Sequence, residues 1–539
     1  MLPLSTLVLL SFGALSLHVL WRTVLRVYLS PLRAIRGPPI PSVLYGHVRQ
    51  VCRAGNATTM REWEVQYGQN ASCRYLLQVP CLWTADPLTV RHILHSGNYS
   101  KPWETRVSAA KVIGDGVLVA EGERHRGQRA VLNPAFGPAQ IREFVPIFIE
   151  KAAELRDVWL DALSVQGERP VINVLEGLKK MTLDVIGLAG FDYHLEALNA
   201  HGKPNELNEA FYQLFSVTPP LSLYRLLMDN LPFLDFFPDR RARAVRRAQA
   251  TMRRIGMELI QDRKAAVLRE VTGQRGTIDK KDLPGKDLLT LLIKANMATD
   301  IPEHKRLSDE EVLSQIPTFL VAGHETTSTA AAWFLFALTQ SPDVQSKLRE
   351  ELLAVDTESP TMEQLTSLTY LDHVVRETLR LHAPVTFTLR GAERDDVIPV
   401  SQPFVDRYGQ LQHEIRIAKG NRIIIAILAL NQSTAIWGED ALQFKPERWE
   451  NPPKEAAEIP GAWSNMMTFS GGPRACIGFR FSIIELKALV FTLVRAFEFQ
   501  LAVTPDDITR VGMFTQRPAL KSELAKGAQM KLVVRPYSR

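Results

Sequence analysis

The chain has 539 residues, of which 46% are hydrophobic and 23% charged, with a formal net charge of +6 and a pI near 9.0. This composition is ordinary for a folded protein with a sizeable core and excludes a disordered chain. The basic residues are scattered and no nucleic-acid-binding motif accompanies them. An acidic redox partner or a negatively charged membrane surface therefore suits the charge better than nucleic acid does.

The chain contains four cysteines, which are few for its length: Cys52, Cys73, Cys81 and Cys476. This number favours a reducing compartment and a thiol used as a ligand over a disulfide framework. No internal repeat or long polar linker divides the chain, so we expect one large domain over residues 44–539 behind a short leader.

Residues 2–21 carry no charged side chain when His18 is neutral, and this stretch just spans a hydrocarbon core of about 30 Å. Four arginines follow it: Arg22, Arg26, Arg33 and Arg36. By the positive-inside rule they hold the downstream chain on the cytoplasmic side. A cleaved signal peptide is the alternative, but it would carry its basic residues before the apolar run. We predict a transmembrane signal-anchor at 2–21 and a stiff, basic and proline-rich linker at 22–43.

The large domain has mostly helical periodicity, for example over residues 150–163 and 287–298. Strand patterns are fewer. Residues 415–423 form two branched runs around a Gly-containing turn, which predicts a β-hairpin. The sequence therefore predicts a predominantly helical α+β fold.

The most informative segment runs from Phe469 to Gly478 and reads Phe-Ser-Gly-Gly-Pro-Arg-Ala-Cys-Ile-Gly. Its glycines let the backbone turn tightly and approach a flat ligand, and backbone donors near the sulfur of Cys476 temper its electron donation. Arg474 offers a fork of donors that suits a carboxylate. The apolar helical run at 479–493 would direct its positive N-terminal end toward the sulfur. An isolated cysteine in such a turn would more often be structural, but the surrounding pattern favours a metal ligand.

This segment resembles the haem-binding signature of the cytochrome P-450 family, Phe-x-x-Gly-x-Arg-x-Cys-x-Gly, at every fixed position. The resemblance implies the cytochrome P-450 fold and haem b, iron protoporphyrin IX, held through an axial thiolate of Cys476. It also implies that Phe469, Arg474 and Gly478 belong to the cofactor site. The segments 133–137 and 189–193 look like fungal membrane-bound members. We therefore expect a single-pass protein of the endoplasmic reticulum membrane, with its catalytic domain in the cytoplasm.

A second informative segment begins with a capping box, in which Ser308 is the N-cap and Glu311 lies three residues on. The apolar pattern that follows predicts one helix of roughly 30 residues ending near residue 340. We expect a bend within a turn of Pro317, because proline cannot donate to the carbonyl of Leu313.

The middle of this helix, residues 322–328, reads Ala-Gly-His-Glu-Thr-Thr-Ser and resembles the acid-alcohol motif of the family. We expect Gly323 to leave space for dioxygen, Thr326 to order water beside it, and Glu325 to relay protons from solvent. Hydroxyls in the motif can bond back to the i−4 carbonyl and loosen the helix. Alone, the motif would more often reflect core packing with a surface glutamate, and it gains weight only beside the cysteine loop.

Glu377 and Arg380 are spaced to share a helix face. An isolated pair of this kind is usually a solvated surface contact. Here it resembles the Glu-x-x-Arg pair of the family, with Arg448 completing a buried triad. We assign these three residues a structural role, because buried ions must be fully paired.

His125 and Arg129 are spaced i and i+4 and can both donate to carboxylates. Many relatives carry tryptophan at the position of His125, and histidine keeps a ring N–H donor. Arg390 matches another arginine that binds a haem propionate in the family, although an ordinary strand-edge arginine is the alternative. We expect His125, Arg129 and Arg390 to bind the cofactor together with Arg474.

The resemblance places the distal substrate pocket among several segments, and its expected lining residues are Phe319, Ala322, Val385, Phe387 and Phe514. These residues are mostly apolar, which favours a lipophilic substrate. The leucine- and phenylalanine-rich segment 219–238 either dips into the membrane at the substrate entrance or packs in the core.

The leading interpretation is a monooxygenase that inserts one oxygen atom from O2 into a lipophilic small molecule, such as a terpenoid or another secondary metabolite. No flavin or nicotinamide fingerprint is present, so the electrons would come from a separate NADPH-dependent flavoprotein reductase. Two alternatives remain. A haem-thiolate isomerase or dehydratase would not need Glu325 and Thr326, and a haem sensor or gas carrier would need neither this relay nor a large pocket.

Overall fold

The computed structural model describes Gly13 and residues 26–52, 56–165, 170–199, 205–215, 240–273, 287–297, 306–512 and 515–538. The predicted anchor at 2–21, apart from Gly13, and the whole of segment 219–238 lie outside these ranges. No helix within the described ranges combines the length and apolar character that a membrane crossing requires.

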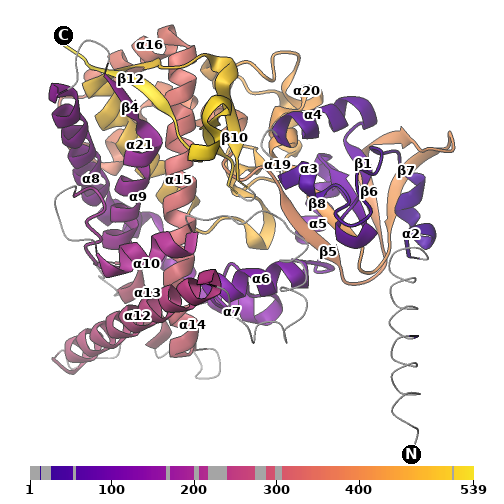
Figure 1. The fold of residues 1–539 in the computed structure, drawn as a ribbon, viewed down its shortest axis with the longest axis horizontal. Helices are drawn as coiled ribbons and strands as arrows, with labels where there is room; N and C mark the ends of the chain where they lie inside the picture. Colours follow the sequence, from indigo (N-terminus) through magenta and orange to yellow (C-terminus); the bar gives the residue numbers. More distant parts are fainter. Residues whose placement is uncertain are drawn as a thin grey trace, which may run out of the picture.

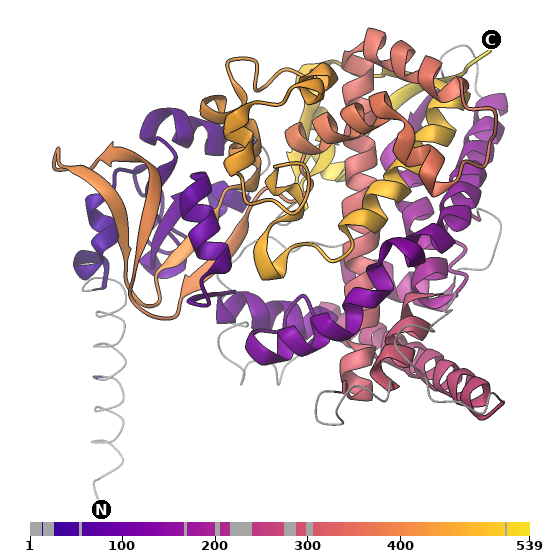
Figure 2. The ribbon, with the colours of Figure 1, turned by 180° about the vertical axis from the view of Figure 1, so that it is seen from behind.

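The larger part of the molecule is a group of helices around α15 (Gln315–Gln340), which runs through its centre (Figures 1 and 2). Its main neighbours are α9 (Val174–Phe191) and α21 (Phe479–Ala496), and α8 (Pro138–Val165) packs against both of these. α9 is apolar over most of its circumference, as expected for a helix that is buried between others.

The other helices of this part surround that centre. They are α6 (Trp103–Ile113), α7 (Gly122–Leu132), α10 (Glu206–Phe215), α12 (Arg240–Gly273), α13 (Leu288–Met297), α14 (Asp309–Leu313), α16 (Pro342–Leu353), α17 (Met362–Ser367) and α18 (Thr369–Leu381).

The smaller part is built on a five-stranded sheet in the order β1-β2-β8-β5-β3. The strands are β1 (Asn70–Arg74), β2 (Pro80–Thr84), β3 (Tyr99–Ser100), β5 (Thr388–Ala392) and β8 (Arg422–Ile425). The helices beside it are α2 (Arg26–Leu29), α3 (Val48–Cys52), α4 (Asn56–Tyr67), α5 (Pro87–His95), α19 (Ile427–Gln432) and α20 (Thr434–Trp437).

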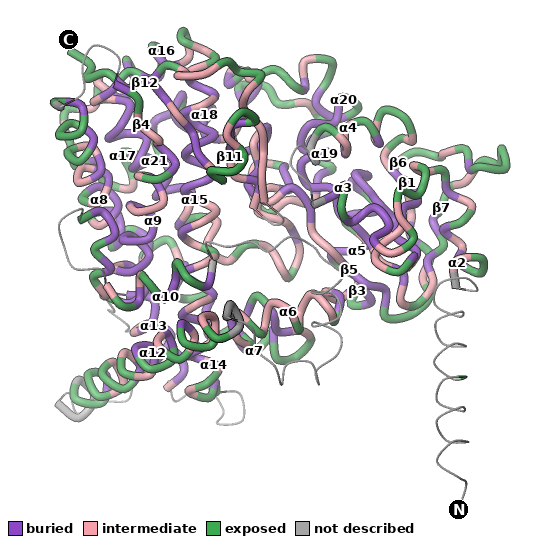
Figure 3. Tube along the Cα trace, in the orientation of Figure 1, coloured by how far each residue is buried: buried purple, intermediate pink, exposed green. Residues whose placement is uncertain are grey.

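Three smaller sheets complete the fold: β4 (Val171–Asn173) with β12 (Lys531–Pro536) and β9 (Phe497–Leu501), β6 (Asp396–Val405) with β7 (Leu411–Ile417), and β10 (Ile508–Val511) with β11 (Arg517–Leu520). Figure 3 shows that the central helices and the five-stranded sheet are buried, whereas α12 and the tip of the β6–β7 pair are exposed. The predominantly helical α+β fold predicted from the sequence is confirmed.

The β-hairpin predicted at 415–423 is wrong. A turn does form there, with the Asn421 N–H donating to the carbonyl of Ala418 at 2.9 Å. The strands on its two sides nevertheless join different sheets, because β7 pairs with β6 whereas β8 pairs with β2 and β5. Ile423 and Ile425 are fully buried, so the backbone of β8 needs a hydrogen-bonding strand on each side.

The predicted linker at 22–43 is not a free spacer over its whole length. Leu32 and Ile35 are buried in the core, and the Ser72 N–H of β1 donates to the carbonyl of Arg36 at 2.8 Å. The folded body therefore begins before residue 44, because these apolar side chains lose water contact against the sheet.

The single helix of roughly 30 residues predicted from the sequence is two helices, which separate within one turn of Pro317, where the sequence predicted a bend. The capping box at Ser308 and Glu311 starts α14, which ends at Leu313, and α15 begins at Gln315. Ser314 lies between them, one turn before the proline that cannot donate a hydrogen bond.

Candidate functional site

Cys476 lies in a tight loop between the short 3-10 helix at Gly472–Arg474 and the start of α21. Its N–H donates to the carbonyl of Phe469 at 2.9 Å. A Cβ added at Gly471 would lie 1.8 Å from the Pro460 carbonyl oxygen, and Gly472 has a φ of +66°. Only glycine satisfies the backbone at these two positions, which accounts for the glycines of the sequence pattern.

The surroundings of the Cys476 sulfur act on the pKa of the thiol in opposite directions, and burial has the larger effect. The residue is exposed, but enough protein surrounds its sulfur that burial raises the pKa of the thiol above the ordinary value. The backbone N–H of Gly478 and the charge of Arg129 oppose this shift. Coordination to a cation would deprotonate such a thiol outright.

The donor set fits haem better than a metal ion held by protein ligands alone. Among the described residues no group of three or more His, Cys, Asp or Glu side chains could hold a metal ion. A porphyrin brings its own four nitrogen donors and needs a single protein thiolate on that side of the iron.

Positive charges gather near this loop and fit the haem propionates. Arg474 pairs with Glu121 and donates to the Ala120 carbonyl at 2.8 Å. Arg390 interacts electrostatically with Arg474 and Glu121. Burial is the main cause that lowers the pKa of Arg390 to about 10. His125 is buried, and burial followed by the charge of Arg474 lowers its pKa to about 4, so the ring is neutral and keeps one N–H donor.

Sequence reasoning missed Lys101, which belongs to the same cluster. Burial, followed by the charges of Arg474 and Arg390, lowers its pKa to about 7. Glu121 is the carboxylate that opposes these shifts. Three cations around one carboxylate leave an excess of positive charge, which the two propionates of haem b would neutralise. Lys101 follows a two-residue strand and belongs to no motif, so only its neighbours reveal it.

Arg129 lies elsewhere in the cluster than expected. Its Nη1 donates to the Ala475 carbonyl at 2.6 Å and its Nε to the Asn133 side chain at 2.9 Å. It therefore braces the residue before Cys476, and its contact with a haem propionate stays a prediction.

The acid-alcohol motif lies in the middle of α15, which remains continuous there. The Thr326 hydroxyl donates to the Ala322 carbonyl at 2.7 Å, as the sequence predicted. Glu325 forms an ion pair with Arg517 of β11, whose Nη1 lies 3.4 Å from Oε1. Nothing in the sequence pattern pointed to this arginine.

Gly323 has a different role from the expected one. A Cβ at this position would lie 3.0 Å from Cδ1 of Ile186 on α9. The missing side chain therefore lets α9 approach α15 closely, and the expectation that it leaves space for dioxygen is not supported.

The structure describes four of the five residues expected to line the pocket. Val385 forms a β-bridge with Thr515, and the Trp333 side chain of α15 donates to the Gln516 carbonyl at 3.0 Å, so these segments do meet beside α15. Ala322 is exposed on the same helix. Phe387 is buried with 5% exposure, and Phe514 lies outside the described residues.

Phe319 has a packing role. Its ring stacks on Phe191 and meets the edge of Phe136, with centroids 6.4 and 5.7 Å apart, and only 6% of the residue is exposed. Phe319 therefore packs against these two rings, and its place in the substrate pocket stays a prediction.

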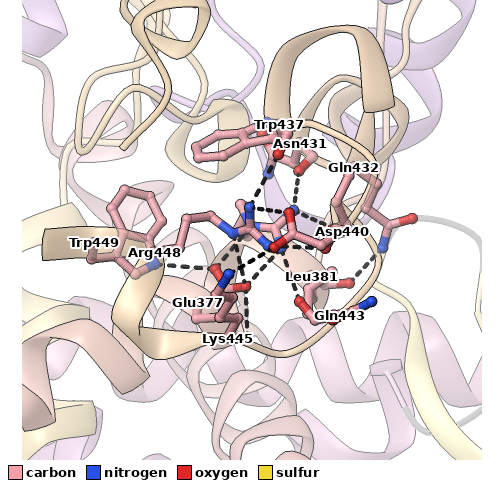
Figure 4. A network of polar contacts seen from close by, with 12 residues as sticks. Glu377, Leu381, Asn431, Gln432, Trp437, Asp440, Gln443, Lys445, Arg448 and Trp449 are labelled. Atoms are coloured by element: carbon pink, nitrogen blue, oxygen red, sulfur yellow. Dashed lines mark hydrogen bonds and ion pairs between the residues drawn. The ribbon is translucent and has the colours of Figure 1, made fainter. Parts of the chain in front are cut away.

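Glu377, Arg380 and Arg448 form a buried ion network. Figure 4 shows Glu377 and Arg448 within it. Glu377 accepts from Arg380 at 2.7 and 2.9 Å, from Arg448 at 3.4 Å and from the Trp449 indole at 3.1 Å. Arg448 also pairs with Asp440 at 2.6 Å. Each ion is therefore paired, as a buried network requires.

This fold and this loop define a haem-thiolate protein. The family model described as cytochrome P450 matches residues 36–522. Cytochrome P450 monooxygenase 205 of Postia placenta is 52% identical over 98% of each chain, and monooxygenase 128 of that fungus is 49% identical over 96% of this chain and 95% of its own. Ganoderic acid synthetase of Ganoderma lucidum is 33% identical over 94% of each chain. The chain belongs to the cytochrome P450 family, whose members are oxidoreductases that use haem b with a cysteine thiolate as axial ligand.

Proposed function

We propose that this protein inserts one oxygen atom from O2 into a lipophilic small molecule, using electrons from an NADPH-dependent flavoprotein reductase. The pairing of Glu325 and Thr326 on α15 with Cys476 before α21 carries this proposal. The two helices pack against each other, which supports a site shared by this acid, this hydroxyl and the thiol loop. An isomerase or a gas carrier would have no use for this pair.

Each residue of the site has a proposed role. Cys476 would hold the haem iron through its thiolate, and Phe469 and Gly478 shape the loop that presents this residue. His125, Arg390, Arg474 and Lys101 bind the propionates. Bound haem supplies the iron at which dioxygen is activated.

Two residues of the chain, Glu325 and Thr326, then move protons toward the oxygen site. Glu325 passes a proton toward the hydroxyl of Thr326, and this hydroxyl orders water beside the oxygen site.

For the substrate we propose a terpenoid or another secondary metabolite. The relative named ganoderic acid synthetase supports this class. We further propose that residues 2–21 anchor the protein in the endoplasmic reticulum membrane with the catalytic domain in the cytoplasm. The uncharged leader and the arginines after it support this placement.

The proposal is tested with detergent-purified holoenzyme. A library of lipophilic compounds is screened for a blue shift of the haem Soret band, and each hit is incubated with NADPH, with and without purified reductase. We expect a product that gains one oxygen atom, labelled from isotopic O2, only when the reductase is present. Conversion of a peroxide without reductase, and no oxygen gain with it, would overturn the proposal in favour of an isomerase.

A further inference from the structure

Four residues of α9 form a stripe that leads from solvent to the acid-alcohol motif. Glu176, Lys179, Thr182 and Ile186 are spaced by three or four residues, so they share one face of the helix. At the inner end, Ile186 lies against Gly323, and the Thr182 hydroxyl donates to the His324 carbonyl at 3.1 Å. This face of α9 therefore touches α15 at the two residues that precede Glu325.

The outer end of the stripe reaches the surface. The Glu176 side chain is 64% exposed and pairs with Lys180 at 3.3 Å. Lys179 lies between this exposed carboxylate and the interior, and it interacts electrostatically with both Glu176 and Glu325. Lys179 is thus the residue of this stripe that interacts with both carboxylates.

Arg517 of β11 contacts Glu325 from outside α9 and α15. Its guanidinium pairs with Glu325, and its side chain is only 16% exposed. The carbonyl of the preceding residue, Gln516, accepts a hydrogen bond from the Trp333 side chain of α15. Arginine does not release its proton in proteins, so Arg517 can hold the Glu325 carboxylate but cannot pass a proton to it.

We propose that Lys179 passes protons from solvent to Glu325, with Glu176 collecting them at the surface and Arg517 holding the Glu325 carboxylate in place. For each of the two protons that a cycle consumes, the Lys179 ammonium gives a proton to the Glu325 carboxylate and becomes a neutral amine, which solvent reprotonates through Glu176 or water. No electrons move in this step. No ion pair joins the described residues Lys179 and Glu325 directly, so the proton crosses through water.

The charges around Lys179 suit this task. Burial and then Arg517 lower the pKa of Lys179 to about 8, although Glu325 and Glu176 oppose the shift. An ordinary lysine would hold its proton too tightly near neutral pH. The groups that face this region are Glu176 and Lys180 on α9, His324 and Glu325 on α15, Arg517 on β11, and Tyr212 on α10.

His324 is the competing carrier, and the structure argues against it. Burial, followed by the charges of Lys179 and Arg517, lowers its pKa to about 3. The ring is therefore neutral at any physiological pH and has no exchangeable charge to pass on.

The test rests on the proposed monooxygenase function and compares Lys179→Met and Lys179→Arg with wild type. Lys151→Met on α8 is the control, because Lys151 is also poorly exposed, at 14%, and pairs with Glu154. Product, NADPH and hydrogen peroxide are measured with reductase and a compound that shifts the Soret band. Both Lys179 variants should form roughly tenfold less product per NADPH and more peroxide, a loss smaller than the ~100-fold of general acid catalysis because water partly substitutes.

Cumene hydroperoxide separates a proton defect from a structural one. It supplies oxygen that is already reduced, so turnover with it needs no protons from solvent. Both Lys179 variants should keep wild-type activity with this oxidant and wild-type carbon monoxide spectra. An unchanged ratio of product to NADPH, or an equal loss with both oxidants, would overturn the role of Lys179. Wild type that forms no product with reductase would instead overturn the proposed function.

A second readout does not depend on turnover. Lysines of the holoenzyme are reductively methylated with carbon-13 formaldehyde, and the signal missing from Lys179→Arg is followed by NMR against pH. We expect a midpoint near pH 8. Titration together with the exposed lysines would contradict the proposal.

Discussion

Single residues near the proposed haem site differ in how the chain holds them. The backbone N–H groups of Cys476 and Ala475 both donate within the loop, and Arg129 braces the carbonyl of Ala475 from outside. Among the described residues, the Thr326 hydroxyl by contrast bonds within its own helix, to the carbonyl of Ala322. Substitution should therefore affect the two residues differently.

Replacing the sulfur should abolish the family's characteristic spectrum. In Cys476→Ser a hydroxyl that ionises poorly takes the place of the thiol, and it binds iron weakly. The reduced, carbon monoxide-bound protein should lose the long-wavelength Soret band. Cys81→Ala, which changes a buried cysteine of β2, should keep this band. An unchanged spectrum in Cys476→Ser would refute the ligand assignment.

Removing the Thr326 hydroxyl should uncouple NADPH use from product formation. In Thr326→Ala the water beside the oxygen site loses its anchor, so NADPH oxidation should continue while peroxide rises and product falls several-fold, within the ~100-fold scale of acid–base catalysis. The matched control is Thr318→Ala, because Thr318 also donates to its own i−4 carbonyl, at 2.8 Å. A wild-type ratio of product to NADPH in Thr326→Ala would make Thr326 a packing residue.

Acid should destabilise the fold through His324. Burial lowers its folded-state pKa to about 3, whereas the unfolded chain has the ordinary value of 6.5. Between these values the unfolded state binds more protons, so this contribution is present above pH 6.5 and is lost as the pH falls toward 3. Its size is on the order of a few kcal/mol.

The test compares melting temperatures of the holoenzyme over this pH range. His324→Phe keeps the ring contact with Phe211, whose centroid lies 5.2 Å away, and should melt with a weaker dependence on pH than wild type. His413→Gln changes an exposed histidine of β7 and should follow wild type. Parallel curves for His324→Phe and wild type would contradict this assignment.

At the scale of elements, the division between α14 and α15 is held by tertiary contacts as well as by Pro317. Gly114 and Gly116 pass so close to Ser314 that a Cβ at Gly116 would lie 2.7 Å from the Ser314 carbonyl oxygen and 2.6 Å from the Thr318 hydroxyl. The two glycines therefore allow their segment to pack closely against the helix break at Ser314.

Gly116→Ala should therefore destabilise the protein by about 1–3 kcal/mol through overpacking. Gly127→Ala on α7 meets nothing within 4 Å and should be neutral or slightly stabilising, because alanine favours helix. Melting temperatures of the two variants measure the difference. Equal melting temperatures would show that the segment before α7 moves aside easily.

At the scale of the whole molecule, natural glycosylation sites are poor reporters of membrane topology. Three of the four sequon asparagines, Asn70, Asn98 and Asn431, are buried with 7%, 2% and 0% exposure. The side chain of the fourth, Asn56, lies outside the described part. Missing glycans at these sites would therefore not distinguish the two orientations.

An added sequon reports the orientation directly. Tyr408, 58% exposed, lies in the turn between β6 and β7, and Tyr408→Asn combined with Gln410→Thr places a sequon there. With the catalytic domain in the cytoplasm, endoglycosidase treatment should not change the mobility of the protein. The same variant behind a cleavable signal peptide should be glycosylated and serves as the positive control. A glycan on the protein with its own leader would reverse the proposed topology.

The sequence by itself determined the features that depend on neighbouring residues. The cysteine loop needs its glycines within a few positions of Cys476, the capping box pairs Ser308 with Glu311, and the missing donor of Pro317 acts within one turn. Such patterns can be read from the sequence, because the hydrogen bonds and φ angles that define them involve residues only three or four positions apart.

Only the tertiary structure decided which distant segments meet. It paired β8 with β2 and β5, brought Lys101 beside Arg390 and Arg474, and set Arg517 of β11 against Glu325. These partners lie between about 30 and 370 residues apart in the chain. Local sequence alone would allow many other pairings of each segment. Burial selects among them, because every strand edge and every charge removed from water must find its partner in the same packed core.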